Sequence, residues 1–477
     1  MSPVRTRFAP SPTGFLHVGG VRTALFAWLV AKHFNGQFIL RFEDTDQKRE
    51  VEGAKDHLIK SLKILGINYD EGPDIGGPYA PYIQSLRLDS YKTWANKLVE
   101  SGRAYADPYT AEEVQFFRKE AAEQKKPFLY RNHRPSKTEQ WDGSKPLRFR
   151  SEPKDYAWHD EVMGDLSTTA DVIDDFVLIK SDGFPTYNFA HIIDDHEMNI
   201  THVLRGQEFI SSVPNYLNLH EALGIQPPIF ATMPHILGPD GQKKLSKRDG
   251  ARDVLEYIDI GYLPEALVSF IATLGWNDGT EQEIYSTSEL INKFSLDKVQ
   301  RSGARFDEKR LNWMNGSLIR QMDIKSLFSS VRNYWPPEAA DFDDAYKEKV
   351  LALFQERLKY FSELTELSKF FFKDLPVDPI LISENKQLNK LSGGELKELL
   401  NKTLTKLQDS SFNNEELIEK LNQLLDETNQ KPAVLFSLIR IAISQAPSSP
   451  PLSETLAVLG KERALQRITD QISALSS

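Results

Sequence analysis

The stretch from Arg7 to Gly20 constrains the fold more than any other part of the chain, because it predicts a strand, a turn and the start of a helix. It reads Arg-Phe-Ala-Pro-Ser-Pro-Thr-Gly-Phe-Leu-His-Val-Gly-Gly. Val21, Leu25 and Leu29 then share one apolar helical face, and Asn35-Gly36 ends the helix. The free N–H groups and the positive dipole end of this helix point at the turn. Such a junction suits a bound nucleotide. It equally suits close packing of strand on helix, so the stretch alone leaves both interpretations open.

Composition restricts the class of protein. The chain has 477 residues, enough for about three domains, with 26% charged and 40% hydrophobic residues, as in soluble globular proteins. The longest apolar run near the N-terminus, Ala24 to Ala31, is too short to span a bilayer, so we predict a cytoplasmic protein without a membrane segment. The lack of cysteine excludes disulfides, thiol nucleophiles and cysteine-ligated zinc, and the histidines form no His-x-x-x-His pair. We therefore predict no protein-held metal.

Charge is unevenly distributed along the chain. The net charge of -10 argues mildly against a general nucleic-acid coat, since phosphate binding needs local positive charge. Residues 115–150 nevertheless contain ten Lys or Arg with aromatic side chains interleaved among them. A solvated basic face is the usual explanation of such a run, and a nucleic-acid surface is the sharper one.

The predicted elements alternate as in a doubly wound α/β protein with a parallel sheet. After the opening strand and helix we expect a strand at 37–42, helices at 51–65 and 82–98, strands at 191–193 and 202–204, a helix at 216–223 and a strand at 229–236. Residues 106–185 lose this alternation, hold short strands at 147–150 and 176–180, and contain the basic run. They indicate an inserted α+β domain.

Helical patterns dominate from residue 251 onward. Beyond about residue 325 the strand signals disappear, and leucines recur at helical spacing. One such segment carries Leu396, Leu399, Leu400, Leu404 and Leu407. The C-terminal region is therefore predicted to be all-α.

Two short motifs could bind phosphate. The chain has neither a Walker loop nor a G-x-G-x-x-G turn after a strand, so P-loop ATPases and dinucleotide dehydrogenases lack their key residues here. The candidates are His17 with Gly19-Gly20, and the loop Lys244-Leu245-Ser246-Lys247-Arg248, whose cations could stabilise a departing pyrophosphate. A lysine-rich loop alone is usually a solvated turn. The two motifs in this order, with doubly wound sequence between them, are far more specific.

Together these motifs resemble those of class I aminoacyl-tRNA synthetases, and more narrowly the bacterial-type glutamyl-tRNA synthetase family. The resemblance runs through nearly the whole chain, on Arg7 to Gly14, Arg41 to Asp46, Gly77 to Tyr79, Gln84-Ser85, Phe184 to Tyr187 and Arg205-Gly206. It implies a Rossmann-type catalytic domain in two parts (1–105 and 186–250), split by an acceptor-stem-binding insertion (106–185). A helical stem-contact domain (251–325) and an all-α anticodon-binding region (326–477) would follow.

The resemblance also implies a glutamate pocket formed by Arg7, Ala9, Ser11, Glu43, Tyr187 and Arg205. An amino acid with two carboxylates needs an acid for its ammonium and arginine forks for its carboxylates. Glu43 suits the ammonium, Arg7 and Arg205 suit the carboxylates, and Arg205 is our choice for the side-chain carboxylate. For Glu43 a helix-entry charge, and for Arg205 a surface ion pair, are the structural alternatives. His191 falls in this region, where a packed histidine is the expected role.

For ATP with Mg²⁺, the resemblance implies binding by His17, Gly19, Gly20 and Glu208, and by the loop residues Lys244, Ser246, Lys247 and Arg248. Lys247 would stabilise the pyrophosphate, while Thr45 and Arg49 would hold the terminal adenosine of tRNA. Gly20 replaces the usual histidine of the first signature. Some relatives bind zinc near Ala104 to Tyr109, but the cysteine ligands are absent here, so we predict no zinc.

The predicted function is a two-step ligase. Glutamate and ATP would give glutamyl-adenylate and pyrophosphate, and the acyl group would then pass to a glutamate-accepting tRNA, with glutamine tRNA left open as a second substrate. A monomer is expected. A nucleotidyltransferase on the same sheet and a non-catalytic tRNA-binding paralogue are the alternatives. The helical C-terminal region and Arg205 argue against the first, and His17, Glu43 and Lys247 argue against the second.

Overall fold

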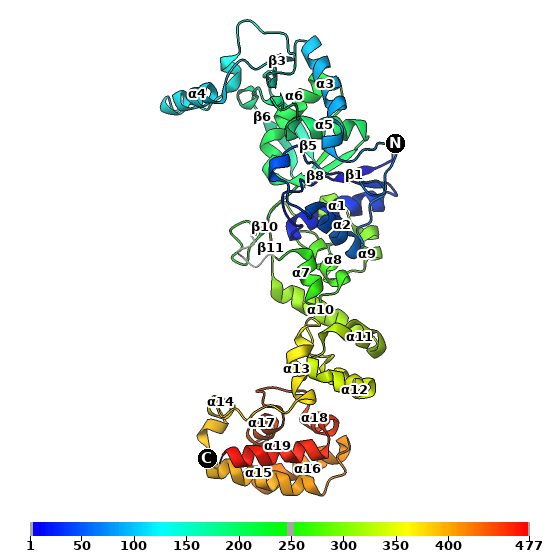
Figure 1. Ribbon diagram of the computed structural model, residues 1–477, viewed down its shortest axis with the longest axis vertical. Coiled ribbons are helices and arrows are strands. Elements are labelled where there is room, and N and C mark those ends of the chain that lie inside the picture. Colours follow the sequence, from blue (N-terminus) through cyan, green and yellow to red (C-terminus); the bar gives the residue numbers. More distant parts are fainter. Residues whose placement is uncertain (1–2, 246–251, 476–477) are drawn as a thin grey trace. The chain divides into compact units, whose positions relative to one another are not determined.

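The computed structural model describes residues 3–245 and 252–475, and the chain divides into two compact units (Figure 1). The first unit comprises Met1–Ile258 and Pro264–Leu311, and the second comprises Asp259–Leu263 and Asn312–Ser477. Each unit has its own core. The predicted boundaries at residues 105, 185, 250 and 325 remain predictions.

A large mixed sheet forms the centre of the first unit. Among the described residues its order is β2-β1-β8-β9-β5-β6. Its strands are β1 (Arg5–Phe8), β2 (Gln37–Leu40), β5 (Tyr156–Asp160), β6 (Gly164–Thr168), β8 (His202–Gly206) and β9 (Ile229–Met233). All neighbours pair in parallel except β5 and β6, which form an antiparallel hairpin at one edge. The predicted parallel α/β fold is confirmed, with this antiparallel edge added from residues inside the predicted insertion.

Helix α1 (Val18–His33) begins where the sequence predicts a helix. The His17 ring accepts a hydrogen bond from the Gly19 N–H at 3.1 Å and so caps the first turn. The helix is buried on nearly all sides, since it packs on β1 and β8 and against α8 (Pro264–Ala272) and α9 (Thr287–Lys293). Asn35, at φ 53°, lies in the left-handed region just past its end.

Further helices cover the sheets. They are α2 (Ala54–Ile64), α3 (Leu88–Glu100), α5 (Tyr187–Glu197) and α6 (Val213–Leu223). The predicted strand at 191–193 is wrong, because these residues lie inside α5. That helix packs between α3 and α6 and buries Phe189, Ala190, Ile192 and Ile193. Because α5 is buried on several faces, its sequence lacks the helical repeat of apolar and polar residues, and the β-branched pair Ile192-Ile193 then resembles part of a strand.

A separate three-stranded antiparallel sheet has the order β3-β4-β7. Its strands are β3 (Ala104–Ala106), β4 (Leu147–Phe149) and β7 (Val177–Ile179). Helix α4 (Ala111–Glu123) follows β3 and starts with a capping box of Thr110 and Glu113. Figure 1 shows α4 extending away from the sheets of the first unit.

The remaining elements of the first unit follow β9. Two short parallel strands, β10 (Ile236–Leu237) and β11 (Ala304–Arg305), pair with each other, so the predicted strand at 229–236 is in fact divided between two sheets. Helix α7 (Val254–Asp259) leads toward the second unit, and α10 (Glu308–Gln321) continues into it. Of the predicted lysine loop, Ser246, Lys247 and Arg248 lie outside the described residues.

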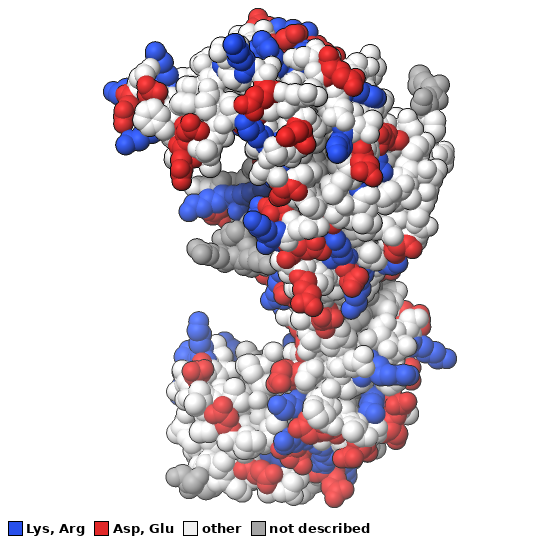
Figure 2. Space-filling model, turned by 45° about the horizontal axis from the view of Figure 1, so that its top comes forward, with Lys and Arg blue, Asp and Glu red and all other residues white. Residues whose placement is uncertain are grey.

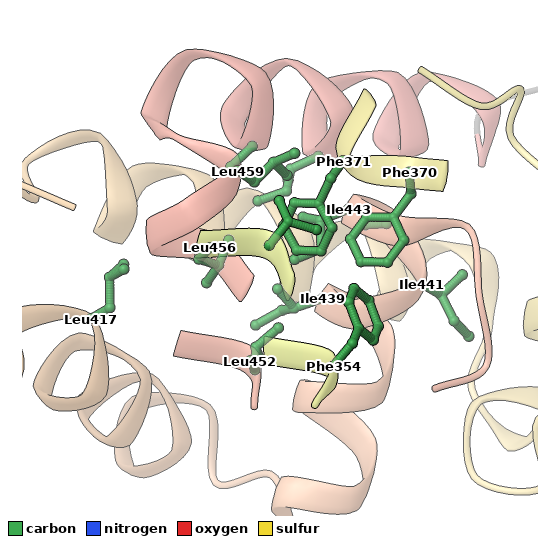
Figure 3. Packing of buried hydrophobic residues seen from close by; sticks show 14 of the residues in the cluster. Phe354, Phe370, Phe371, Leu417, Ile439, Ile441, Ile443, Leu452, Leu456 and Leu459 are labelled. Carbon is green, nitrogen blue, oxygen red and sulfur yellow. The ribbon is translucent and has the colours of Figure 1, made fainter. Parts of the chain in front are cut away.

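The described part of the second unit consists of helices joined by turns, which confirms the predicted all-α region. The helices are α11 (Ile324–Ser330), α12 (Asp344–Phe354), α13 (Glu363–Phe372), α14 (Ile380–Ser383), α15 (Gly393–Gln408), α16 (Asn414–Thr428), α17 (Pro432–Ser444), α18 (Leu452–Leu459) and α19 (Lys461–Ala474). Figure 3 shows Phe354, Phe370 and Phe371 packed near Ile439 and Leu456 in its core.

Candidate active site

A pocket of about 750 Å³ opens in the first unit beyond the carboxyl ends of β1 and β2, at the start of α5. Ligands of open α/β sheets bind at this edge. Among its lining residues are five from the predicted site: Ser11, Glu43, Thr45, Arg49 and Tyr187. Residues far apart in the sequence, which were assigned to the amino acid and to the tRNA end, therefore share one cavity.

A buried ion-pair network lies behind this pocket. Arg41 is fully buried, donates to Glu43 Oε1 at 2.8 Å and lies 2.9 Å from Asp195 Oδ1. Arg7 donates to both oxygens of Asp195, at 3.1 and 3.3 Å, and to the carbonyl of Leu204 at 3.3 Å. Asp195 thus joins the two arginines, and Arg7 is already paired in the free protein.

The network sets the charges of its carboxylates. Burial raises the pKa of Glu43 to about 7, although Arg41 and Arg7 oppose that shift. Burial acts on Asp195 in the same direction, yet Arg7 and Arg41 outweigh it and hold the pKa of Asp195 below its usual range. Of the two carboxylates, Glu43 is the one whose charge changes near neutral pH.

Arg205 is a further buried cation of the first unit. It projects from β8 and is only 6% exposed, yet neither of its terminal nitrogens has a hydrogen-bond partner. Its guanidinium carbon lies 4.9 Å from the ring centroid of Tyr216 and 5.4 Å from that of Phe209. Phe209 also lines the pocket, so Arg205 lies against a lining residue although it does not line the pocket itself.

Tyr187 and His191 form the adjoining aromatic wall. Their rings stack with centroids 4.8 Å apart, and Tyr187 also lies 5.3 Å from Phe209. His191 is buried and its Nδ1 lies 2.7 Å from the Tyr187 carbonyl oxygen. Burial and the nearby Arg205 lower the pKa of His191 well below its ordinary value. A neutral His191 therefore donates from Nδ1 and packs in this wall.

The residues predicted for ATP that the structure describes come from the start of α1 and from the segments after β8 and β10. His17, Gly19 and Gly20 begin α1, and a Cβ added to Gly20 would come within 2.7 Å of Leu16 Cδ1. Glu208 lies 3.6 Å from Lys244 Nζ and 3.8 Å from His235 Nδ1. None of the predicted ATP residues that the structure describes lines the 750 Å³ pocket.

The remaining predicted residues are less constrained. Ala9 is half-buried directly after β1, and Thr45 is buried, with its carbonyl accepting from Lys180 Nζ at 3.0 Å. The Arg49 side chain is 74% exposed and lies 4.0 Å from Asp46. Sequence reasoning missed the structural roles of Arg41 and Asp195. Arg41 belongs to the Arg41 to Asp46 motif, but nothing local to Asp195 announces its partners.

Neither a metal cluster nor a spanning helix is found in the part of the chain that the structure describes. Those residues contain no group of three or more His, Asp or Glu that could hold a metal ion, and the absence of zinc remains a prediction. No described helix is long and apolar enough to cross a membrane. Figure 2 shows acidic and basic side chains interspersed over the face it presents.

Comparisons with known proteins agree along the chain. Residues 3–313 match the family described as tRNA synthetases class I (E and Q), catalytic domain, and residues 326–472 match the anticodon binding domain. A glutamate–tRNA ligase of Dehalococcoides mccartyi (strain BAV1) is 41% identical over 99% of this chain and 98% of that protein. One of Clostridium botulinum (strain Hall) is 41% identical over 99% of both.

A solved structure gives the same result. The crystal structure of a glutamate tRNA ligase from Elizabethkingia meningosepticum, in complex with its amino acid, aligns with a TM-score of 0.87 and 33% identity. The alignment covers 99% of this chain and all of that one. The chain therefore belongs to the class I tRNA synthetases and, within them, to the glutamate–tRNA ligase family.

Proposed function

We propose that this protein is an ATP-dependent glutamate–tRNA ligase that works in the cytoplasm. In the first step the α-carboxylate of glutamate attacks the α-phosphorus of ATP, which forms glutamyl-adenylate and releases pyrophosphate. In the second step the acyl group passes to a hydroxyl of the terminal ribose of tRNA, and AMP leaves. The family match and the full-length relatives support this reaction.

The unpaired guanidinium of Arg205 is the observation that carries the choice of amino acid. A buried cation without a partner is costly, so its site is completed by an anion. Beside a pocket that already holds Glu43, the fitting ligand carries an ammonium at one end and a carboxylate at the other. Glutamate meets this requirement, whereas the neutral amide of glutamine would leave Arg205 unpaired.

The other predicted residues take supporting roles in this proposal. Glu43 binds the ammonium when ionised, and Arg7 supplies a second positive charge for the carboxylates while it remains tied to Asp195. Ser11, Ala9 and Tyr187 form the walls. Thr45 and Arg49, at the same pocket, hold the terminal adenosine of tRNA.

ATP with Mg²⁺ binds at the start of α1 in this proposal. The first-turn N–H groups of α1 and the His17 ring face the phosphates, while Gly19 and Gly20 keep side chains out of the way. Glu208 and Lys244 contact the nucleotide from the segments after β8 and β10. Neither step needs an enzyme nucleophile, so the catalytic work is positioning and charge stabilisation.

The discriminating experiment is pyrophosphate exchange into ATP. A glutamate–tRNA ligase should exchange only with glutamate, and we expect exchange in the presence of tRNA. A nucleotidyltransferase would exchange without glutamate, and a tRNA-binding paralogue would not exchange at all. Either result would refute the ligase.

The sequence also assigns pyrophosphate stabilisation to Lys247. We expect Lys247→Ala to slow activation by about 10²-fold or more, while glutamate binding changes little. Equal losses in rate and in binding would argue against a role in the transition state. Exchange kinetics on this variant measure the rate of activation, and glutamate titrations measure the affinity for glutamate.

A further inference from the structure

Asp253 lies where the start of α7 meets the start of α1, which carries His17 of the proposed ATP site. Its Oδ1 accepts hydrogen bonds from the N–H groups of Leu255 at 2.8 Å and Glu256 at 3.1 Å, so it caps the start of α7. Its backbone forms an antiparallel bridge with His17, and the Val254 N–H donates to the Leu16 carbonyl at 3.3 Å. Asp253 therefore lies directly against the start of α1.

His57 holds Asp253 from a third segment. It lies in the first turn and a half of α2, and its Nε2 is 3.3 Å from Asp253 Oδ1 across 196 residues of sequence. Its ring stacks on Phe15, with centroids 4.4 Å apart and planes at 20°. Phe15 is 42% exposed and immediately precedes the Leu16-His17 pair. The His57 imidazole thus contacts Asp253 on one side of this bridge and Phe15, two residues before His17, on the other.

The same turn of α2 is also tied to the amino-acid pocket. Lys55 Nζ lies 3.1 Å from Asp44 Oδ2 and 2.9 Å from Glu50 Oε1. Asp44 in turn accepts from the N–H and the hydroxyl of Ser85, both at 2.8 Å, and it directly follows Glu43. Lys55 and His57 therefore connect the glutamate end of the site to the nucleotide end through two residues of one short helix.

We propose that His57 is a positioning residue for glutamate activation. Through Asp253 and Phe15 it fixes the start of α1, with His17, relative to the pocket that contains Glu43. Its imidazole touches neither substrate in this scheme. Adenylate formation needs the α-carboxylate and the α-phosphate in close register, so a small displacement between the two groups slows the reaction without weakening glutamate binding. The inference rests on the proposed function.

Two variants of His57 test the contribution of its ring stacking and that of its hydrogen bond separately. His57→Phe keeps a ring on Phe15 and removes the donor to Asp253. We expect it to lower kcat for glutamate-dependent pyrophosphate exchange about tenfold, with the KM for glutamate within about twofold, as for loss of one hydrogen bond to a charged group. His57→Gln keeps an N–H donor and should recover part of the loss.

Asp253→Ser completes the test, because serine still caps α7 but does not reach His57. Its kcat should fall as for His57→Phe, and the double variant should be no slower than either single variant, since both remove the same contact. His33→Phe is the matched control. His33 is another half-buried histidine with one carbonyl partner, Ile291, and one ring contact, Phe34. The His33→Phe variant should leave kcat unchanged.

The outcomes separate the two proposals. If the wild-type protein exchanges and His57→Phe keeps kcat within twofold, the positioning role is refuted, even if that variant melts at a lower temperature. Multiplicative losses in the double variant would refute it as well. A wild-type protein without glutamate-dependent exchange in the presence of tRNA would overturn the proposed function and this inference together.

Discussion

Replacing Arg205 by methionine should move stability and activity in opposite directions. The guanidinium is a buried cation whose terminal nitrogens lack hydrogen-bond partners. Taking an ion out of water costs several kcal/mol. The rings of Tyr216 at 4.9 Å, and of Phe209 and Phe230 at 5.4 Å, return about 0.5–2 kcal/mol each. Ring contacts do not replace the hydrogen bonds that a buried charge needs, so the position remains unfavourable in the free protein.

Methionine fills a similar volume without charge. We therefore expect Arg205→Met to stabilise the first unit by about 1–3 kcal/mol, which raises its Tm by a few degrees at roughly 2 °C for each kcal/mol. In the proposed function the same change also removes the partner of the substrate's side-chain carboxylate. A buried charged pair of this kind is worth about 2–5 kcal/mol on truncation, so kcat/KM for glutamate should fall roughly 30- to 4,000-fold.

Thermal melting followed by circular dichroism, and exchange kinetics at varied glutamate, measure the two effects. Arg103→Met is the matched control, since Arg103 also lies over an aromatic ring, 5.3 Å from the centroid of Phe149, but it donates to Asn218 Oδ1 and to the Arg150 carbonyl. Its loss should lower the Tm and leave the KM for glutamate unchanged. A lower Tm for Arg205→Met, or a kcat/KM within tenfold of wild type, would refute the assignment of Arg205.

Three further predictions test other parts of the structure. The kcat/KM for glutamate should fall as the pH drops through about 7, because burial raises the pKa of Glu43 to about 7 and a neutral Glu43 cannot pair with the ammonium group. The variant Glu43→Gln should show no such fall in kcat/KM with pH. Gly20→Ala should cost at most about 1 kcal/mol of stability but raise the KM for ATP, because its Cβ would meet Leu16 Cδ1 at 2.7 Å and this flexible side chain, next to His17, would have to shift. Gly14→Ala, with no atom within 4 Å, should be neutral. Leu400→Ala should destabilise the second unit by about 2–5 kcal/mol in urea melts and weaken tRNA binding, whereas Ile418→Ala, at a 45% exposed position, should do neither.

The Glu43 shift also has a consequence for stability. A carboxyl whose pKa is higher in the folded state than its ordinary value of 4.5 binds its proton more tightly when folded. Its contribution to stability is therefore complete below about pH 4.5 and is lost as the pH rises through about 7. Glu43→Gln should remove this dependence, which urea titrations at several pH values would measure.

Local patterns predicted the parts of the fold that are amphipathic or bounded by clear turns. The helix after His17 and the leucine-rich helix carrying Leu396 and Leu400 are where the sequence places them. The pattern failed where an element is buried on several faces, as in α5, because the signal depends on alternation between buried and exposed positions. The hairpin of β5 and β6 was missed for another reason. Its two strands are short and have few buried positions, so they carry little apolar alternation, and the pairing of β5 with β9 is a long-range contact that no local pattern encodes.

The candidate site, like the fold, was only partly predictable from local sequence. Motifs predict Glu43, Tyr187 and Arg205 as site residues, and these remain predictions, but the sequence could not show that Asp195 pairs with Arg7 across 188 residues. Ion pairs depend on which elements become neighbours, and β1, which carries Arg7, meets α5, which carries Asp195, only in the folded protein. Which arginine near the pocket is left without an ion-pair partner therefore depends on the fold and not on a local motif.

The different bonding of Arg7 and Arg205 leads to different expectations for the two arginines in substrate selection. Arg7 was expected to bind a carboxylate, yet its Nε and one terminal nitrogen are bonded to Asp195, and its other terminal nitrogen is bonded to the Leu204 carbonyl. A substrate carboxylate would have to share Arg7 with an acid whose pKa is already lowered by that pairing. Arg205 offers both terminal nitrogens without such competition. Discrimination between a carboxylate and an amide should therefore depend on Arg205, whereas Arg7 mainly fixes Asp195 and the network that holds Glu43.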